Sequence, residues 1–272
     1  MRTVLVTGGS SGIGRAAVER FARGGDRVWF TYRSGRQRGL DTVAELSAHG
    51  WQAEAFEFDQ GNWSSHERLI EQLPGPVEVL VNNAAVGSAT VDRYVPGPAH
   101  ERTAALLRIN SLGPLWLIQQ ILPGMLDRGY GKIINVSSVG GGVAVYPEFH
   151  VADGMSKAAL AYLTRHLAAE LVHQPIGVFA ICPGAVETTM LEESTLARLP
   201  TPRRRELEAR LPQGRLIQPM EIAELMWWLA TDAAQVLHGS VVDASMGLGV
   251  HPGLLTGWSA GAAHADIGNT VA

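Results

Sequence analysis

Residues 4–7 form a short apolar run that leads directly into a glycine-rich turn. Gly8, Gly9, Gly12 and Gly14 follow within seven positions, and a helical pattern of apolar residues begins at the last of them. Glycine allows positive φ, so it lets a strand turn into a helix over few residues. This strand–turn–helix order limits the chain to folds that combine strands and helices.

Beyond the turn, apolar runs rich in β-forming residues alternate with longer amphipathic segments. The predicted strands are residues 4–7, 27–32, 53–58, 77–82, 132–136, 177–181 and 241–242. The predicted helices are residues 14–22, 40–49, 63–73, 101–122, 153–171 and 220–231. Strands that are apolar on both faces and separated by helices indicate a parallel sheet covered on both sides. We therefore expect a single-domain α/β fold with three layers, α/β/α, around a doubly wound parallel sheet.

One domain is expected to span residues 1–250, because a chain of 272 residues suits a single doubly wound unit and no repeat or linker interrupts it. Within this domain, residues 191–212 break the alternation with three prolines and a basic run at 203–205. This segment is expected to be a solvated face or a mobile lid. Residues 251–272 are rich in glycine and alanine, so we expect a frayed tail or a subunit contact.

Composition and charge exclude several classes of function. The formal net charge of −4 argues against nucleic acid or an anionic membrane as the partner. Cys182 is the only cysteine, so an internal disulfide and a cysteine-based zinc site are excluded, and the histidines show no metal-ligand spacing. We expect no bound metal. No apolar run is as long as a membrane span and the N-terminus lacks a signal-peptide pattern, so a cytoplasmic location is expected.

The glycine-rich turn is also suited to bind phosphate. Its glycines let the backbone approach a pyrophosphate closely, and the helix that follows presents unpaired N–H groups and a positive dipole end. Such a turn alone is a weak signal, but the strand before it and the helix after it supply the context that the motif requires. We therefore expect residues 7–14 to bind the diphosphate of a dinucleotide.

The pattern Thr7-Gly8-x-x-x-Gly12-x-Gly14 resembles the signature of classical short-chain dehydrogenases/reductases. Further matches, which extend to about residue 249, are Asp59, Asn82-Asn83-Ala84-Ala85, Asn110, Ser138, Lys157 and residues 183–188. The resemblance implies a Rossmann-type sheet, typically of seven parallel strands, with a small-molecule substrate and assembly as a homotetramer or homodimer. The implied cofactor contacts are Gly8, Ser10, Ser11, Gly12, Ile13, Gly14, Tyr32, Arg33, Ser34, Asp59, Gln60, Asn83, Ala84, Ala85, Lys157, Pro183, Gly184, Val186 and Thr188.

The end of the second predicted strand bears on the choice of nicotinamide cofactor. Relatives that use NAD(H) place an acid there to hold the ribose hydroxyls. Tyr32, Arg33 and Ser34 occupy this region, so no acid repels a 2′-phosphate, and Arg33 can offer it a planar charged fork. We therefore favour NADP(H) over NAD(H). The alternative is that Arg33 is a solvated arginine and that NAD binds without the usual acid.

The resemblance fails at one position. The family pattern Tyr-x-x-x-Lys places a tyrosine, the family's proton donor or acceptor, four residues before Lys157, but Asp153 stands there. Aspartate titrates near ~3.9 and tyrosine near ~10, so a carboxylate beside Lys157 can act as a base but is a poor acid. Tyr146 lies too far back to align with the missing hydroxyl unless the loop before Asp153 is reshaped.

Three interpretations of this departure stay open. Asp153 is a helix N-cap with no proton chemistry, or it is the acid/base group itself, or another group supplies the proton. His150 is the best side-chain candidate for the third interpretation, because histidine titrates near physiological pH. A water relayed by Ser138, Lys157 and Asn110 would serve equally well.

These observations predict an NADP(H)-dependent oxidoreductase that transfers a hydride between nicotinamide and a carbonyl or alcohol carbon. The candidate catalytic residues are Asn110, Ser138, Lys157, Asp153 and His150. In this hypothesis Ser138 holds the substrate oxygen, Lys157 binds the ribose hydroxyls and Asn110 orders a water. The rival hypothesis is a protein that keeps the dinucleotide as a structural or sensing ligand and catalyses non-redox chemistry or none.

Overall fold

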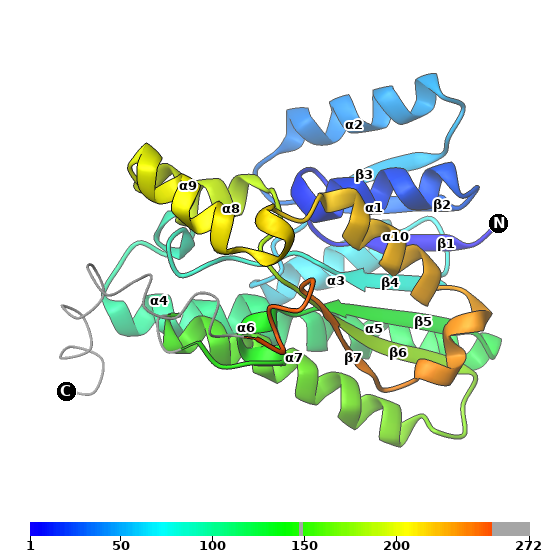
Figure 1. Ribbon diagram of the computed structural model, residues 1–272. Helices are drawn as coiled ribbons and strands as arrows, with labels where there is room; N and C mark the ends of the chain where they lie inside the picture. The colour runs from blue at the N-terminus through cyan, green and yellow to red at the C-terminus, as the bar shows by residue number, and fades with distance from the viewer. Residues whose placement is uncertain (147–148, 252–272) are drawn as a thin grey trace.

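Seven parallel strands form one sheet in the computed structural model, which describes residues 1–146 and 149–251 (Figure 1). The strands are β1 Thr3–Val6, β2 Arg27–Tyr32, β3 Ala53–Glu57, β4 Val79–Asn82, β5 Gly131–Val136, β6 Ile176–Pro183 and β7 Val241–Ala244. Their order across the sheet is β3-β2-β1-β4-β5-β6-β7, so the connections run outward in both directions from β1. The predicted doubly wound parallel sheet is confirmed. Apart from His251, the predicted tail lies outside the described residues.

Helices cover both faces of the sheet (Figure 1). One face is covered by α1 (Gly12–Arg23), α2 (Arg36–Ala48) and α10 (Pro219–Leu229). The other is covered by α3 (Trp63–Gln72), α5 (Gly113–Arg128) and α7 (Val151–Glu170). Every residue of β1, β4, β5 and β6 is buried between these two layers, which explains why their sequences are apolar without alternation.

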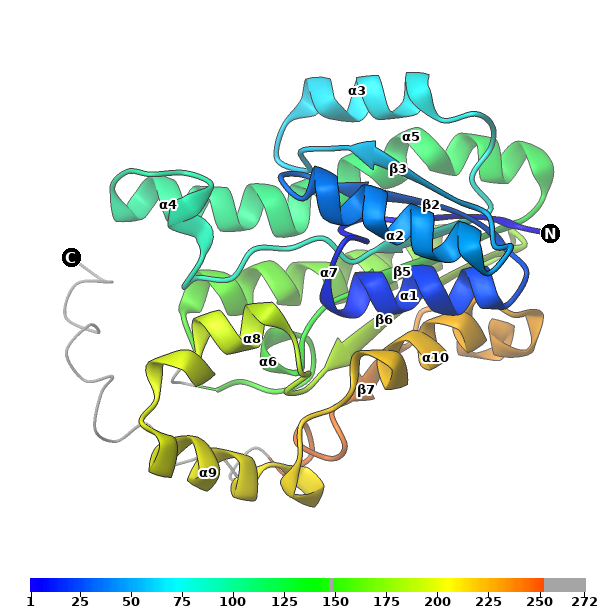
Figure 2. The same cartoon turned by 90° about the horizontal axis from the view of Figure 1, so that it is seen from above.

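The central strands end side by side. The register aligns the carboxyl ends of β1, β4, β5 and β6, so the loops that follow these strands meet at one edge of the sheet. The remaining helices α4 (Ala99–Leu107), α6 (Val139–Gly142), α8 (Thr189–Ser194) and α9 (Thr201–Arg210) lie beside this edge (Figures 1 and 2). Ligands of open α/β sheets bind at the carboxyl ends of the strands, which makes this edge the place to look for a site.

The helix predicted over residues 101–122 is helical throughout, but it is not uniform. The structure divides it into α4, a π-helical turn at Arg108–Leu112 and α5. Pro114 lies in the first turn of α5, where a proline has no N–H to continue the hydrogen-bond ladder of the preceding helix. The predicted helix is therefore confirmed, and what the apolar period did not show is the π-helical turn before Pro114.

The segment 191–212 is mostly helical. It contains the end of α8, a 3-10 turn at Leu196–Arg198 and the whole of the largely exposed helix α9. In the basic run, Arg204 forms ion pairs with Glu192 at 2.8 Å and with Glu208 at 3.1 Å. The run therefore lies on a solvated face, as one of the two interpretations expected, and a lid function stays a prediction. Other 3-10 turns are Val91–Arg93, Pro212–Gly214 and Asp232–Leu237.

None of the helices in the described residues combines the length and the apolar character that crossing a membrane requires. In the same part of the chain, no three His, Cys, Asp or Glu side chains are grouped so that they could hold a metal ion. Cys182 is a buried free thiol in β6.

Candidate active site

The turn after β1 is built from glycines that the backbone requires. Gly8 and Gly12 have φ of +69° and +53°, in the left-handed region that residues with a Cβ rarely adopt. A Cβ on Gly14 would lie 2.3 Å from the Gly8 carbonyl oxygen, so only glycine allows the turn to close on the start of α1. Ser10 and Ile13 lie within this turn and are half-buried.

The first turn of α1 faces the carboxyl edge with its N–H groups uncapped by a side chain. Ser11 is the N-cap residue, but its hydroxyl accepts no hydrogen bond from the helix. A Cβ on Gly12 would meet Thr188 Cγ2 at 3.2 Å, so the loop after β6 lies directly against this turn. The helix opening therefore offers N–H donors and a positive dipole end next to a second loop, an arrangement that suits an anionic ligand.

Thr7 joins the loops that follow β1 and β4. Its Oγ1 accepts the N–H groups of Asn83 at 3.0 Å and Ala84 at 2.9 Å, while Asn83 Nδ2 donates to the Thr7 carbonyl at 2.9 Å. Gln60 Nε2 donates to the carbonyls of Ala84 and Ile109, both at 2.8 Å. The side-chain amides of Asn83 and Gln60 thus hold backbone in place, and Ala85 continues the loop.

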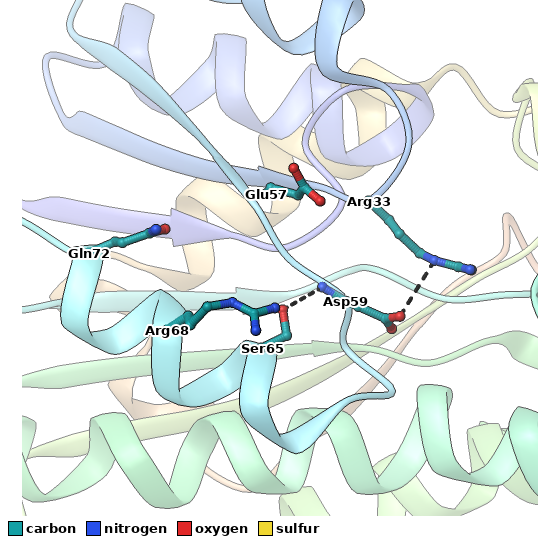
Figure 3. A pocket seen from close by; sticks show the side chains of 6 residues that line it. All are labelled: Arg33, Glu57, Asp59, Ser65, Arg68 and Gln72. Carbon is teal, nitrogen blue, oxygen red and sulfur yellow. Dashed lines mark hydrogen bonds and ion pairs between the residues drawn. The ribbon is translucent and has the colours of Figure 1, made fainter.

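Arg33 lies at the far end of this edge, after β2. Its Nε is 3.7 Å from Asp59 Oδ2, and its Cζ lies 3.9 Å above the centre of the Tyr94 ring. Figure 3 shows the ion pair of Arg33 and Asp59 among the side chains that line a pocket, whose volume is about 480 Å³. The pocket is lined by Arg33, Glu57, Asp59, Ser65, Arg68 and Gln72. Tyr32 is buried and Ser34 exposed, so Arg33 is the charged group that β2 presents here.

Asn110 lies in the π-helical turn between α4 and α5 and is buried. Its Oδ1 accepts the Val86 N–H at 2.9 Å, and its Nδ2 donates to the Val86 carbonyl at 2.8 Å and to Ser156 Oγ at 3.1 Å. The Ser156 hydroxyl in turn donates to the Asp153 carbonyl at 2.7 Å. Asn110 therefore satisfies backbone groups and fixes the first turns of α7 against the loop after β4.

Ser138 lies two residues after the end of β5, and Lys157 of α7 contacts the end of the same strand. Ser138 is the N-cap of α6 and accepts the Gly140 N–H at 3.2 Å. Lys157 Nζ donates to the Val136 carbonyl at 3.3 Å, and the Lys157 carbonyl accepts the Ser137 hydroxyl at 2.8 Å. Desolvation lowers the pKa of the half-buried Lys157 below its usual range, and the Asp153 carboxylate opposes this shift.

Asp153 lies in the first turn of α7, and the interpretation of Asp153 as the N-cap was wrong. His150 is the N-cap residue, and its carbonyl accepts the N–H groups of Asp153 at 3.0 Å and Gly154 at 3.1 Å. The half-buried Asp153 side chain instead accepts the Ser88 N–H at 3.2 Å, across from the loop after β4. A carboxylate one turn before Lys157 therefore points toward the carboxyl edge, whereas the His150 side chain is exposed.

Tyr146 is not available to replace the missing tyrosine in this arrangement. Its side chain is 6% exposed, and its hydroxyl donates to the Leu248 carbonyl at 2.9 Å. Its ring stacks on Phe149 with ring centres 5.0 Å apart. Burial raises the pKa of this phenol, so Tyr146 holds its proton more firmly than a solvated tyrosine.

The loop after β6 completes the edge. Pro183 ends the strand, and a Cβ on Gly184 would lie 3.0 Å from Ser245, so the loop passes close to the end of β7. Val186 pairs with Ile217, and Thr188 caps α8 by accepting the Leu191 N–H at 3.2 Å. The predicted site residues therefore gather along one edge, where Ser11, Arg33, Ser34 and His150 are exposed.

Sequence reasoning missed Ser88, Tyr94 and Ser156 as members of this site. Ser156 adjoins Lys157, so its position in the recognised pattern could have identified it. Ser88 contributes a backbone N–H and Tyr94 an aromatic face, and neither belongs to a motif. Only the folded chain brings these two residues to Asp153 and Arg33.

Comparisons with known proteins agree over nearly the whole chain. A family model described as enoyl-(acyl carrier protein) reductase matches residues 8–249. The acetoacetyl-CoA reductase of Rhizobium meliloti is 31% identical over 261 residues, which cover 90% of this chain and 98% of that protein. Two solved structures are also similar. A variant of actinorhodin polyketide ketoreductase with NADPH has 32% identity and a TM-score of 0.81, covering 91% of this chain and 97% of its own. A 3-oxoacyl-(acyl-carrier protein) reductase of Brucella melitensis with bound NAD has 27% identity and a TM-score of 0.77, covering 90% of both chains.

Proposed function

Because this chain belongs to the short-chain dehydrogenase/reductase family, we propose that it is an NADP(H)-dependent oxidoreductase acting on a small-molecule substrate. The observation that carries the proposal is the uncapped, glycine-built opening of α1, which lies against Thr188 at the same edge as Ser138 and Lys157. When bound, a nicotinamide dinucleotide supplies or accepts a hydride. We further expect a homodimer or homotetramer in the cytoplasm, as the sequence suggested.

The residues present fit a dinucleotide. The N–H groups of the first turn of α1 suit its diphosphate, and Gly12 leaves room for the backbone to approach it. Lys157 carries donors suited to ribose hydroxyls, and the loop of Pro183, Gly184, Val186 and Thr188 borders the other side.

Preference for NADP(H) rests on Arg33. Its guanidinium is exposed at the end of β2, where it can form two parallel hydrogen bonds to a 2′-phosphate. Asp59 Oδ2 lies 3.7 Å from Arg33 Nε. The Asp59 carboxylate would repel a 2′-phosphate, and its ion pair with Arg33 offsets part of this repulsion. One similar structure contains NADPH and another contains NAD. The proposed preference for NADP(H) therefore depends on the charge of Arg33 in this chain.

The chain's own groups then position the substrate. Ser138 is placed to donate its hydroxyl to a substrate oxygen, because its Oγ already accepts the Gly140 N–H and keeps its proton free to donate. Lys157 adds positive charge at this edge, and Asn110 fixes the first turns of α7 that carry it. Asp153 stands where the family's tyrosine would be, and we propose that it serves as a carboxylate rather than as a proton donor.

A panel of aldehydes, ketones and cyclic imines tests this function, with NADPH consumption as the readout. We expect turnover that falls at least about a hundredfold in Ser138→Ala and in Lys157→Ala, whereas Ser64→Ala on the exposed face of α3 matches the natural chain. Binding of NADPH without turnover of any substrate would favour the rival hypothesis of a dinucleotide-binding protein that lacks redox activity.

A further inference from the structure

Building on the proposed function, we propose that the reacting group of the substrate is a cationic carbon–nitrogen double bond, an iminium ion or a protonated imine. The product of its reduction is an amine, and the reverse reaction is the oxidation of an amine. Two features of the carboxyl edge support this proposal. One is the set of groups there that can give up a proton, and the other is the charge of the Asp153 carboxylate.

Reduction of a neutral carbonyl needs two things from its surroundings. A hydride must reach the carbon and a proton must reach the oxygen. Of the side chains considered for that proton, the Tyr146 hydroxyl is buried and donates to the Leu248 carbonyl, and His150, the N-cap residue of α7, is exposed. A relayed water is the one other route among those considered. The group that does face the edge, Asp153, accepts a hydrogen bond there from the Ser88 N–H.

An iminium ion removes the need for a proton donor. A bound reduced nicotinamide dinucleotide would supply the hydride: one C–H bond of its nicotinamide ring would break, one C–H bond would form at the iminium carbon, and the π electron pair of the C=N bond would become the lone pair of the amine nitrogen. The dinucleotide is oxidised, the iminium ion is reduced, and no proton enters or leaves. A site that holds a carboxylate in place of an acid is therefore sufficient for this reaction.

The Asp153 carboxylate also favours the reactive form of such a substrate. A negative charge beside a bound imine raises the pKa of the imine, so a larger fraction of it carries the proton that makes the carbon electrophilic. The same charge attracts a permanently cationic iminium ion.

Lys157 is the charged group that would oppose a cation at this edge. Its Nζ is turned to the Val136 carbonyl, at the end of β5, whereas Asp153 Oδ2 is turned to the loop after β4. Their hydrogen-bond partners therefore lie in different segments, although the two charges are close enough to attract each other. A substrate nitrogen on the Asp153 side meets the carboxylate, and Lys157 stays beside the strand end.

Apolar side chains near this edge suit the hydrocarbon part of an imine. Val143, Phe149 and Met190 are each more than two-fifths exposed. The Phe149 ring covers Gly140, two residues after Ser138, because a Cβ built on Gly140 would meet that ring at 2.6 Å. Met190 follows Thr188 in α8. A cyclic imine with an apolar ring would cover part of this surface.

Three probes test the inference with NADPH as reductant: the N-methyl-dihydroisoquinolinium cation, 2-methylpyrroline and the ketone tetralone. We expect kcat/KM for the cation to exceed that for tetralone at least about tenfold. Asp153→Asn keeps the size of the side chain and removes its charge, so it should lower kcat/KM for the cation at least about tenfold. Asp127→Asn, on the exposed end of α5, is the matched control and should change nothing.

Calorimetry supplies a readout that is independent of turnover. The amine product N-methyl-tetrahydroisoquinoline, which is protonated at neutral pH, should bind the natural chain about tenfold more tightly than Asp153→Asn. Faster reduction of tetralone than of the cation would overturn the inference and leave the proposed function intact. Equal binding of the amine to both chains would also overturn it, whereas failure to bind NADPH would contradict the proposed function itself.

Discussion

Ser88 and Asp153, 65 positions apart in the chain, are joined by a hydrogen bond of 3.2 Å from the Ser88 N–H to Asp153 Oδ2. This bond connects the loop after β4 with the first turn of α7, the helix that also carries Lys157. Asn110 connects the same two elements through Val86 and Ser156. The position of the carboxylate is therefore set by two neighbouring contacts rather than by helix α7 alone.

Replacing Asp153 should separate the contribution of this hydrogen bond from that of the charge. Asp153→Ala leaves the Ser88 N–H without its acceptor and should lower the free energy of unfolding by about 1 kcal/mol. Asp153→Asn retains an acceptor oxygen and should lose less. Urea unfolding measures both variants. Equal stability of Asp153→Ala and the natural chain would show that the bond contributes nothing to the fold.

Removing the hydroxyl of Tyr146 tests whether this residue acts in catalysis. Tyr146→Phe deletes one hydrogen bond to the Leu248 carbonyl, so the free energy of unfolding should fall by about 0.5–1.5 kcal/mol. Turnover of the substrates by the folded variant should stay within about twofold of the natural chain, because the hydroxyl is buried and already donates to the Leu248 carbonyl. Loss of turnover in a variant that remains folded would mean that Tyr146 supplies the proton after all.

Arg33 should decide between the two nicotinamide cofactors. Arg33→Ser removes the charged fork at the end of β2, so the dissociation constant for NADPH should rise at least about tenfold while that for NADH changes little. Arg36→Ser, at the exposed start of α2, is the control. A parallel loss of both affinities in Arg33→Ser would instead indicate that Arg33 supports the fold of this loop.

The pKa of Lys157 can be measured directly, because Lys132 and Lys157 are the only lysines in the chain. Burial lowers the pKa of both side chains below the usual range. NMR of lysine labelled with ¹³C at Cε should therefore show two signals that titrate below about 10.4. The signal lost in Lys157→Met is assigned to Lys157, and a midpoint at or above the usual value would contradict the buried environment.

The sign of the effect on stability follows from the direction of the shift. Between the lowered pKa of the folded chain and the usual lysine value, the unfolded chain binds more protons at Lys157 than the folded chain does. The free energy of unfolding should therefore rise with pH across this interval. At lower pH both states carry the charge, and the folded chain bears the full cost of burying it. In Lys157→Met, the free energy of unfolding should rise less with pH across this interval than in the natural chain.

The fold was predictable from the sequence to a large extent. The doubly buried strands and the Gly8–Gly14 turn identify a parallel sheet, and the predicted strand ends lie within two residues of those observed. The apolar period predicted the helical run of α4 and α5, but it could not show the π-helical turn between them before Pro114. The prolines of segment 191–212 did not indicate the helices that start directly after Thr188 and Pro200.

The site was predictable only as a set of residues at one edge. Spacing alone placed Asp153 one helical turn before Lys157, yet it could not show that the Asp153 carboxylate reaches Ser88 instead of capping its own helix. It also could not show that Tyr146 is bound to Leu248. Both contacts join segments that are far apart in the chain, and tertiary packing alone determines them.

Calorimetric titration of the purified chain with NADPH, NADP⁺, NADH and NAD⁺ tests most directly whether the opening of α1 holds a dinucleotide. We expect one binding site per chain for NADPH and NADP⁺, with affinities at least about tenfold higher than for NADH and NAD⁺. Heats that do not exceed those of dilution for all four dinucleotides would contradict the assignment of this edge as an oxidoreductase site.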